Sequence, residues 1–166
     1  MPDRPMTALP RPTKASLRGE LVSLIEADLA ARSRAYRAAR EGATHEESKP
    51  ENDKDTRALE QSYLARGEAM RVEELQAALA ETQTMVLRDL APTDPVGLGA
   101  VVMVEEAGLR QELFVAPHGG GARVGAIHIV TPKSPIGRAL IGTRAGDDCE
   151  FVVAGKTREL RVVAVR

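Results

Sequence analysis

The amino-acid sequence predicts an α+β fold, in which a long antiparallel helical hairpin precedes a small, mostly antiparallel sheet with one helix. Three observations support this prediction. Apolar residues recur at helical spacing over residues 14–41 and again over residues 53–90. A stretch rich in Pro and Gly, residues 91–98, then forms a linker. Beyond it the apolar pattern changes to the period of two that is typical of strands.

Composition limits the partners that the chain can bind. The 23 basic and 24 acidic residues leave a net charge of −1, so no overall field attracts a polyanion. Aromatic residues make up 2% of the chain, too few to stack on single-stranded nucleic acid. The single cysteine excludes an internal disulfide, and no Cys/His cluster has zinc-ligand spacing. No run approaches the ~18 apolar residues that span a membrane. We expect a soluble, cytoplasmic protein without a membrane partner.

The first helix is expected after a disordered tail, residues 1–13, which contains four prolines. Thr13 or Ser16 can cap this helix. Its apolar residues recur every three or four positions: Leu17, Leu21, Leu24, Ile25, Leu29, Tyr36 and Ala39. Gly42 is expected to end the helix, with Arg37 and Arg40 in its last turn.

The second helix carries a coiled-coil seam. The residues of this seam step by three and four: Val72, Leu75, Leu79, Thr82 and Val86. Leu59 and Tyr63 continue this stripe toward the start of the helix, but Arg66 and Gly67 interrupt it. Two helices of this length, joined by a short polar turn, bury their seams best against each other. Residues 14–90 are therefore predicted to form an antiparallel coiled-coil hairpin.

The tip of this hairpin, residues 42–57, is acidic. It carries five carboxylates: Glu46, Glu47, Glu51, Asp53 and Asp55. Such a tip is either a solvated turn or a probe that presents acid groups to another molecule.

Residues 99–166 are predicted to form the second domain. Strands are expected at 100–105, 109–116, 124–130, 149–154 and 158–165. Ser134 and Pro135 start a short helix, as its cap and first residue, and Gly142 ends it. Gly119 to Gly121 lack the Lys-Ser/Thr of a phosphate loop, so a hairpin turn is favoured. Neither His118 nor His128 has a partner that the sequence makes visible.

Several of these segments resemble the bacterial Gre transcript-cleavage factors. Residues 134–142, Ser-Pro-Ile-Gly-Arg-Ala-Leu-Ile-Gly, followed by Gly146-Asp147, look like the hallmark of that family. Further matches are shorter: Leu17-Arg18-Gly19, Glu51-Asn52, Val130-Thr131 and Leu160-Arg161-Val162-Val163. The resemblance covers nearly the whole chain after residue 13.

This resemblance implies a coiled coil followed by a C-terminal domain of FKBP-like topology, an antiparallel sheet with one helix. It implies RNA polymerase as the partner. The C-terminal domain would dock at the rim of the polymerase secondary channel, and the coiled coil would enter the channel. The acidic tip would help to hold a second Mg²⁺ at the polymerase active site, and the polymerase would hydrolyse the 3′ end of a backtracked transcript. The protein would then be no enzyme itself and would bind no metal or cofactor alone. It would reach the nascent RNA 3′ end through the polymerase, touch DNA only indirectly, and act as a monomer.

The resemblance also suggests which residues act at the tip. Two-metal hydrolysis needs a second divalent cation, and one or two carboxylates suffice to hold Mg²⁺. The family tip reads Asp-x-x-Glu-Asn, and here Ser48 stands where the Asp is expected. A neighbouring acid from either side could take that place. The candidate tip carboxylates are therefore Glu46, Glu47, Glu51 and Asp53.

Basic and motif residues complete the candidate site. Arg37, Arg40 and Arg57 could contact the transcript, although an arginine run is usually a solvated helix face. The candidate polymerase-binding motif comprises Ser134, Pro135, Ile136, Gly137 and Arg138, with Arg138 as its most exposed member. Two alternatives remain: a non-cleaving regulator or inhibitor that binds the channel, and an interaction or chaperone module with no polymerase role.

Overall fold

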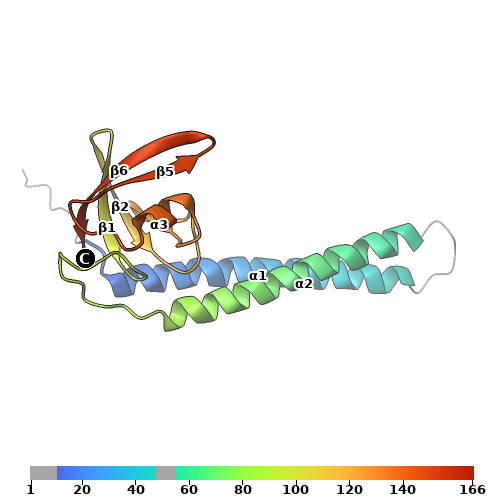
Figure 1. The fold of residues 1–166 in the computed structure, drawn as a ribbon. Coiled ribbons are helices and arrows are strands. Elements are labelled where there is room, and N and C mark those ends of the chain that lie inside the picture. Colours follow the sequence, from blue (N-terminus) through green and yellow to red (C-terminus); the bar gives the residue numbers. More distant parts are fainter. Residues whose placement is uncertain (1–10, 48–54) are drawn as a thin grey trace, which may run out of the picture.

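The computed structural model describes residues 11–47 and 55–166 and confirms the predicted fold class (Figure 1). Two long helices, α1 (Lys14–Glu47) and α2 (Asp55–Thr84), lie side by side as an antiparallel hairpin. A six-stranded sheet with the short helix α3 (Pro135–Leu140) stands at one end of this hairpin, and the other end projects from it as an arm. The predicted disordered tail lies mostly in residues 1–10, outside the described residues.

Helix α1 starts where a threonine caps it. The amide of Ser16 donates a hydrogen bond to Oγ1 of Thr13 at 3.0 Å, and the amide of Leu17 donates to the Thr13 carbonyl oxygen at 2.9 Å. Of the two candidates, Thr13 is therefore the cap.

The predicted end of α1 at Gly42 is wrong, because the helix continues for five residues beyond it to Glu47. A Cβ atom at Gly42 would lie 3.4 Å from Oε1 of Gln61 on α2. This is ordinary van der Waals contact with the end of a flexible side chain, so a larger residue would also fit at this position. The helix passes through Gly42 although glycine disfavours a helix interior by ~1 kcal/mol relative to alanine, because most helical stability in proteins comes from tertiary packing.

Helix α2 ends at Thr84, earlier than the predicted residue 90. The chain that follows runs past the start of α1, where two cations bind its carbonyl oxygens. The guanidinium of Arg18 donates to the Met85 carbonyl at 3.0 Å, and the ammonium of Lys14 donates to the Arg88 carbonyl at 2.5 Å. These contacts replace the hydrogen bonds of further helical turns. Val86 was predicted in the helical seam but is 66% exposed.

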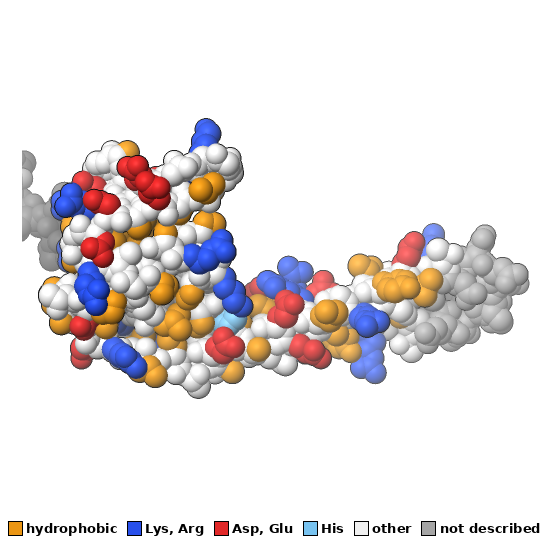
Figure 2. Space-filling view, in the orientation of Figure 1, with side chains coloured by type: hydrophobic (Ala, Val, Ile, Leu, Met, Phe, Trp, Pro, Cys, Tyr) orange, Lys and Arg blue, Asp and Glu red, His pale blue; other side chains and the backbone are white. Residues whose placement is uncertain are grey.

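The seam between α1 and α2 is well packed near the sheet and open toward the tip. Leu75 and Thr82 are buried, and the Thr82 hydroxyl donates to the Ala78 carbonyl at 2.7 Å. Farther out, four large apolar side chains of α2 are more than half exposed: Leu59, Tyr63, Leu64 and Met70. Figure 2 shows hydrophobic side chains on the surface of the arm close to its end. The predicted stripe through Leu59 and Tyr63 is therefore not a buried seam.

The sheet has one parallel pair in an otherwise antiparallel arrangement. Its strands are β1 (Val101–Glu106), β2 (Leu109–Val115), β3 (Arg123–Val124), β4 (Ile127–Val130), β5 (Asp148–Val153) and β6 (Lys156–Val165), in the order β3-β4-β2-β1-β6-β5. Strands β2 and β4 are the parallel pair. The single strand predicted over 124–130 is split into β3 and β4. The Gly119–Gly121 loop is consequently not a simple hairpin turn, because it belongs to the connection that brings β4 back parallel to β2.

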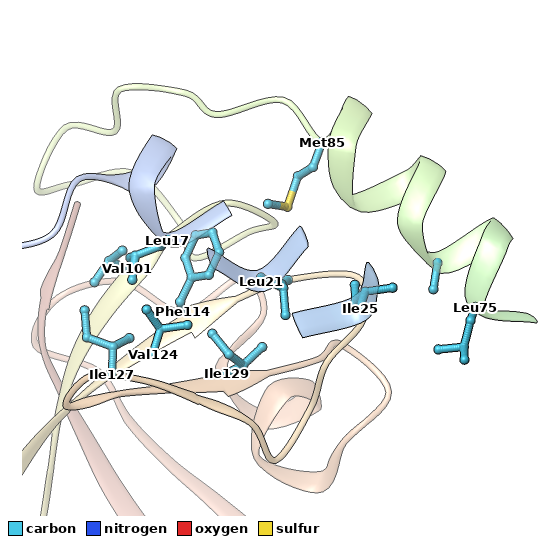
Figure 3. Packing of buried hydrophobic residues seen from close by; sticks show 12 residues of the cluster. Leu17, Leu21, Ile25, Leu75, Met85, Val101, Phe114, Val124, Ile127 and Ile129 are labelled. Carbon is cyan, nitrogen blue, oxygen red and sulfur yellow. The ribbon is translucent and has the colours of Figure 1, made fainter. Parts of the chain in front are cut away.

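The two faces of the sheet supply two separate cores. In the β1–β2 ladder Val101 is opposite Phe114, and the next pair is Val102 opposite Leu113. Successive side chains point to opposite faces of a sheet. Val101 and Phe114 lie in a core with buried residues of the helices, among them Leu17, Leu21, Ile25, Leu75 and Met85 (Figure 3). Val102 and Leu113 lie in the other core, with α3.

The sheet is thus covered by the start of α1 on one face and by α3 on the other. The sequence predicted only α3 as a cover. Since Leu17 and Leu21 are fully buried against the sheet side, the hairpin and the sheet domain share one core rather than meeting only through the linker. Burial of each such leucine contributes about 1.5–3 kcal/mol.

Candidate functional site

Fewer residues connect the two helices at the predicted acidic tip than the sequence suggested. Helix α1 includes Glu46 and Glu47 in its last turn, so their backbone is helical. The other two candidate carboxylates, Glu51 and Asp53, lie outside the described residues, as does Ser48. The connection between the described helices is therefore residues 48–54, rather than 42–57.

The candidate basic residues lie at the distal part of the hairpin. Arg37 and Arg40 are exposed on α1, three residues apart and hence on one face, and Arg57 is exposed in the first turn of α2. Among the residues whose side chains the structure describes, which exclude Glu46, Glu47 and Asp55, none forms an ion pair with these three arginines. Arg32, closer to the sheet, does: its guanidinium lies 3.6 Å from Asp28 and 3.5 Å from Glu68. The distal arginines are therefore exposed at the surface of the arm.

The candidate motif at α3 divides into structural and exposed residues. The Ser134 hydroxyl donates to the Thr131 carbonyl at 2.8 Å and accepts from the Gly137 amide at 3.1 Å, so Ser134 is the predicted cap. Ile136 is half-buried against the second core, and Gly137 is buried. Only Pro135 and Arg138 are exposed. Gly137 therefore acts within the fold and is not accessible to a partner.

A groove of about 440 Å³ runs beside the start of α3. Its walls come from α3, from the glycine loop 119–121 and from the β5–β6 hairpin, and its lining includes Gly120, His128, Ser134, Pro135, Phe151, Val153 and Arg158. We call it the α3 groove. The sequence did not predict it, because its walls are far apart along the chain.

An ion pair fixes one wall of the α3 groove. Arg158 donates two hydrogen bonds to the Glu106 carboxylate, of 2.6 and 2.5 Å, and its guanidinium lies 5.2 Å from the ring centre of Phe151. The hydrogen bond from Arg158 lowers the pKa of the Glu106 carboxyl. The bidentate geometry connects the β1–β2 turn to the β5–β6 hairpin.

A second groove, of about 550 Å³, lies where the glycine loop meets the hairpin. We call it the junction groove. Leu24, Asp28, Arg71, His118 and Gly120 are among its lining residues. Nε2 of His118 lies 2.7 Å from the carboxylate of Glu81 on α2. Local sequence patterns do not indicate this partner, because the two residues are 37 positions apart.

In residues 11–47 and 55–166, no group of three or more His, Cys, Asp or Glu side chains is placed to hold a metal ion. No helix in the same part of the chain is long and apolar enough to cross a membrane.

The sequence of this chain is similar to those of transcription elongation factors named GreA. The family model described as "Transcription elongation factor, GreA/GreB, C-term" matches residues 91–166. Transcription elongation factor GreA of Methylococcus capsulatus is 32% identical over 139 residues, which cover 82% of this chain and 84% of the relative. GreA of Halorhodospira halophila is 29% identical over 150 residues and 90% of each chain. Among solved structures, Thermus aquaticus Gfh1 is 21% identical, with a TM-score of 0.40, covering 87% of this chain and 92% of that one.

Proposed function

We propose, since the chain belongs to the Gre family of transcription elongation factors, that it binds RNA polymerase at the secondary channel and promotes cleavage of backtracked transcripts. In this proposal the sheet domain docks outside the channel, through the exposed Pro135 and Arg138 of α3. The hairpin enters the channel and brings the tip carboxylates to the polymerase active site.

The observation that carries this proposal is the reach of the arm. Helix α1 leaves the shared core after Ile25 and continues to Glu47, about 33 Å at 1.5 Å per residue. Acidic residues at its end are therefore held far from the sheet domain. An arm of this kind suits a protein that delivers side chains into another enzyme's active site.

The proposed chemistry needs little from the chain itself. Mg²⁺ prefers hard oxygen ligands and keeps several waters, so one or two carboxylates are enough to help hold it. We propose Glu51 as the first ligand, with Glu46, Glu47 or Asp53 as the second. The second Mg²⁺ would position and activate the attacking water, and the polymerase would supply the rest of the site. Arg37, Arg40 and Arg57 would contact the phosphates of the transcript's 3′ segment.

Ser48 supports a second candidate function. A serine hydroxyl cannot replace the carboxylate that the family pattern has at this position. With Glu46 and Glu47 in the last turn of α1, their backbone is part of a helix rather than of an adaptable loop. The alternative is therefore a regulator that occupies the channel without stimulating cleavage.

The test is transcript cleavage in stalled, backtracked elongation complexes. We expect the wild-type protein to accelerate cleavage, Glu51→Ala to abolish it, and Glu46→Ala/Glu47→Ala to reduce it. Glu73→Ala, which removes an exposed carboxylate of α2 away from the tip, is the matched control and should cleave normally. Binding without cleavage, together with a gain of cleavage in Ser48→Asp, would establish the non-cleaving regulator instead.

A further inference from the structure

We propose that two copies of this chain pair through the outer faces of their α2 helices, which lie antiparallel in the dimer. The residues that form the contact recur along α2 at steps of four and three, the spacing at which helices pack in coiled coils. We call them the outer stripe: Leu59, Tyr63, Arg66, Met70, Glu73 and Ala77. All of them are exposed. The inference concerns the free protein, so the dimer itself does not depend on the proposed function.

The outer stripe is separate from the side of α2 that packs within the chain. Leu75 and Ala78 are buried in the core that α2 shares with α1 and the sheet. Ala77 follows Leu75 by two residues, so at about 3.6 residues per turn it lies about 200° farther around the helix. Helix α2 therefore carries apolar residues on two opposite sides, and only one side is covered by the chain itself.

The apolar members of the outer stripe expose much of their surface. Leu59, Tyr63 and Met70 are 56%, 66% and 57% exposed. Figure 2 shows hydrophobic side chains on the surface of the arm toward its end. Single exposed apolar residues are common on monomeric proteins, whereas a group of them on one face is typical of an interaction site. Their coiled-coil spacing indicates that the partner is another helix.

Charge identifies the helix that fits. Arg66 and Glu73 are seven residues apart, about 10.5 Å along the axis of α2. Ion pairs on one helix join residues three or four apart, so these two are not placed to pair within one copy. If a second α2 lies antiparallel, with the twofold axis between Arg66 and Met70, Arg66 of each copy comes next to Glu73 of the other. The outer stripe is therefore complementary to itself, as a twofold interface requires. A parallel pair would bring like charges together instead.

Gly67 lies where this axis would pass. It is exposed within α2, and a Cβ atom there would meet no other described atom within 4 Å. Glycine destabilises a helix interior relative to alanine, and packing within the chain does not account for it here. A second helix at this point would, because a residue without a side chain lets two backbones approach closely. The same register places Leu59 of one copy against Ala77 of the other, at the edge of the junction groove, where a small residue leaves room for a large one.

The size of the outer stripe predicts a weak dimer. From Leu59 to Ala77 it is about 27 Å long. A single pair of helices of this length makes a small interface, and small interfaces are typical of transient complexes. We therefore expect the dimer to form reversibly at micromolar concentrations. If the proposed function holds, the paired arms are too thick for one channel, and the monomer is the form that acts on polymerase.

Sedimentation velocity of the full-length protein, without polymerase, measures this dimer. The mass of the wild type should rise from one chain to two across the micromolar range. Arg66→Glu and Glu73→Arg should each weaken dimerisation about tenfold or more, because each brings like charges together at both contacts. An equal mixture of these two variants should dimerise as the wild type does, since the mixed pair again has opposite charges at both contacts.

A second comparison tests the apolar part of the outer stripe. Leu59→Lys should weaken dimerisation about tenfold or more, because it places a charge in the contact. Leu64→Lys is the matched control: Leu64 is 57% exposed, like Leu59, but lies about 140° around α2 from it. It should dimerise as the wild type does. Circular dichroism verifies that each variant keeps its helices.

Three outcomes would overturn the inference. A wild-type protein that stays monomeric throughout the concentration range forms no such dimer. Equal effects of Leu59→Lys and Leu64→Lys would show that the association is not specific to the outer stripe. If the wild type dimerises but the mixture of Arg66→Glu and Glu73→Arg stays monomeric, the helices do not pair in the antiparallel register. Because polymerase is absent, none of these results bears on the proposed function, and a failure to bind polymerase would leave the dimer standing.

Discussion

Replacing Gly137 with alanine should unseat α3 from the sheet. A Cβ atom at this position would overlap the carbonyl oxygen of Thr131, lie 2.7 Å from its carbon, and lie 2.9 Å from Oγ of Ser134. Cβ atoms essentially never approach other heavy atoms within 3.0 Å, and the obstacles here are backbone and a capping side chain rather than a flexible chain end. The turn over residues 131–134 or α3 itself has to move.

The cost has two parts. Moving the turn breaks the cap, in which the Gly137 amide donates to Ser134 Oγ at 3.1 Å, and loss of a cap costs about 0.5–2 kcal/mol. Forcing a methyl group into a packed site costs about 1–3 kcal/mol more. The free energy of unfolding should therefore fall by about 1.5–5 kcal/mol, a large part of the ~5–15 kcal/mol of a typical domain.

Urea denaturation followed by circular dichroism measures this change. Gly97→Ala is the matched control, because a Cβ atom there would meet nothing within 4 Å and its φ is not in the left-handed region. We expect Gly97→Ala to stay within about 0.5 kcal/mol of the wild type. A Gly137→Ala variant as stable as Gly97→Ala would refute the assignment of Gly137 to a packing role.

Two further predictions concern the shared core and the Glu106–Arg158 pair. Leu21→Ala removes a fully buried side chain between α1 and the sheet, and it should lower the free energy of unfolding by about 2–5 kcal/mol, with the helix and sheet signals lost in one transition. Leu64→Ala is its control, because Leu64 is 57% exposed. Separate transitions for the hairpin and the sheet domain would contradict a shared core. Arg158 lowers the pKa of Glu106, so this carboxylate contributes stability above its unfolded pKa of about 4.3, and the contribution is lost as the pH falls through the folded pKa. The urea midpoint of the wild type should therefore exceed that of Glu106→Gln at neutral pH, and the two midpoints should converge in acid. A difference between the midpoints that does not change with pH would show that the ion pair does not cause the difference.

Local patterns predicted the elements of this fold well. The apolar spacing indicated both helices, the change to a period of two indicated the strands, and Ser134-Pro135 located the start of α3. The predicted helix ends were wrong where contacts between distant parts of the chain determine the backbone conformation. Glycine is a common helix stop, but α1 lies against α2 and continues through Gly42 to Glu47. Residues 85–90 have a helical pattern, but Arg18 and Lys14 bind their carbonyl oxygens instead.

The candidate site was harder to predict than the fold. Arg138 and Pro135 are exposed as a contact motif requires, but the buried role of Gly137 depends on Thr131, six residues away. Glu106 and Arg158 are 52 positions apart along the chain, and His118 and Glu81 are 37 positions apart. The walls of the grooves also come from separate parts of the chain. The local spacing of residues does not indicate contacts over such separations. The apolar face of α1 was visible in the sequence, whereas its partner, the sheet, was not.

The core shared by α1 and the sheet also determines when the chain can fold as it leaves the ribosome. Leu17 and Leu21 are made early, but Phe114, Ile127 and Ile129, which cover them, follow about 100 residues later. At a synthesis rate of about 5–20 residues per second, the delay is about 5–20 s. During that interval the base of the first helix exposes an apolar face. Leu17 and Leu21 therefore complete their burial only after the strands that cover them have been synthesised.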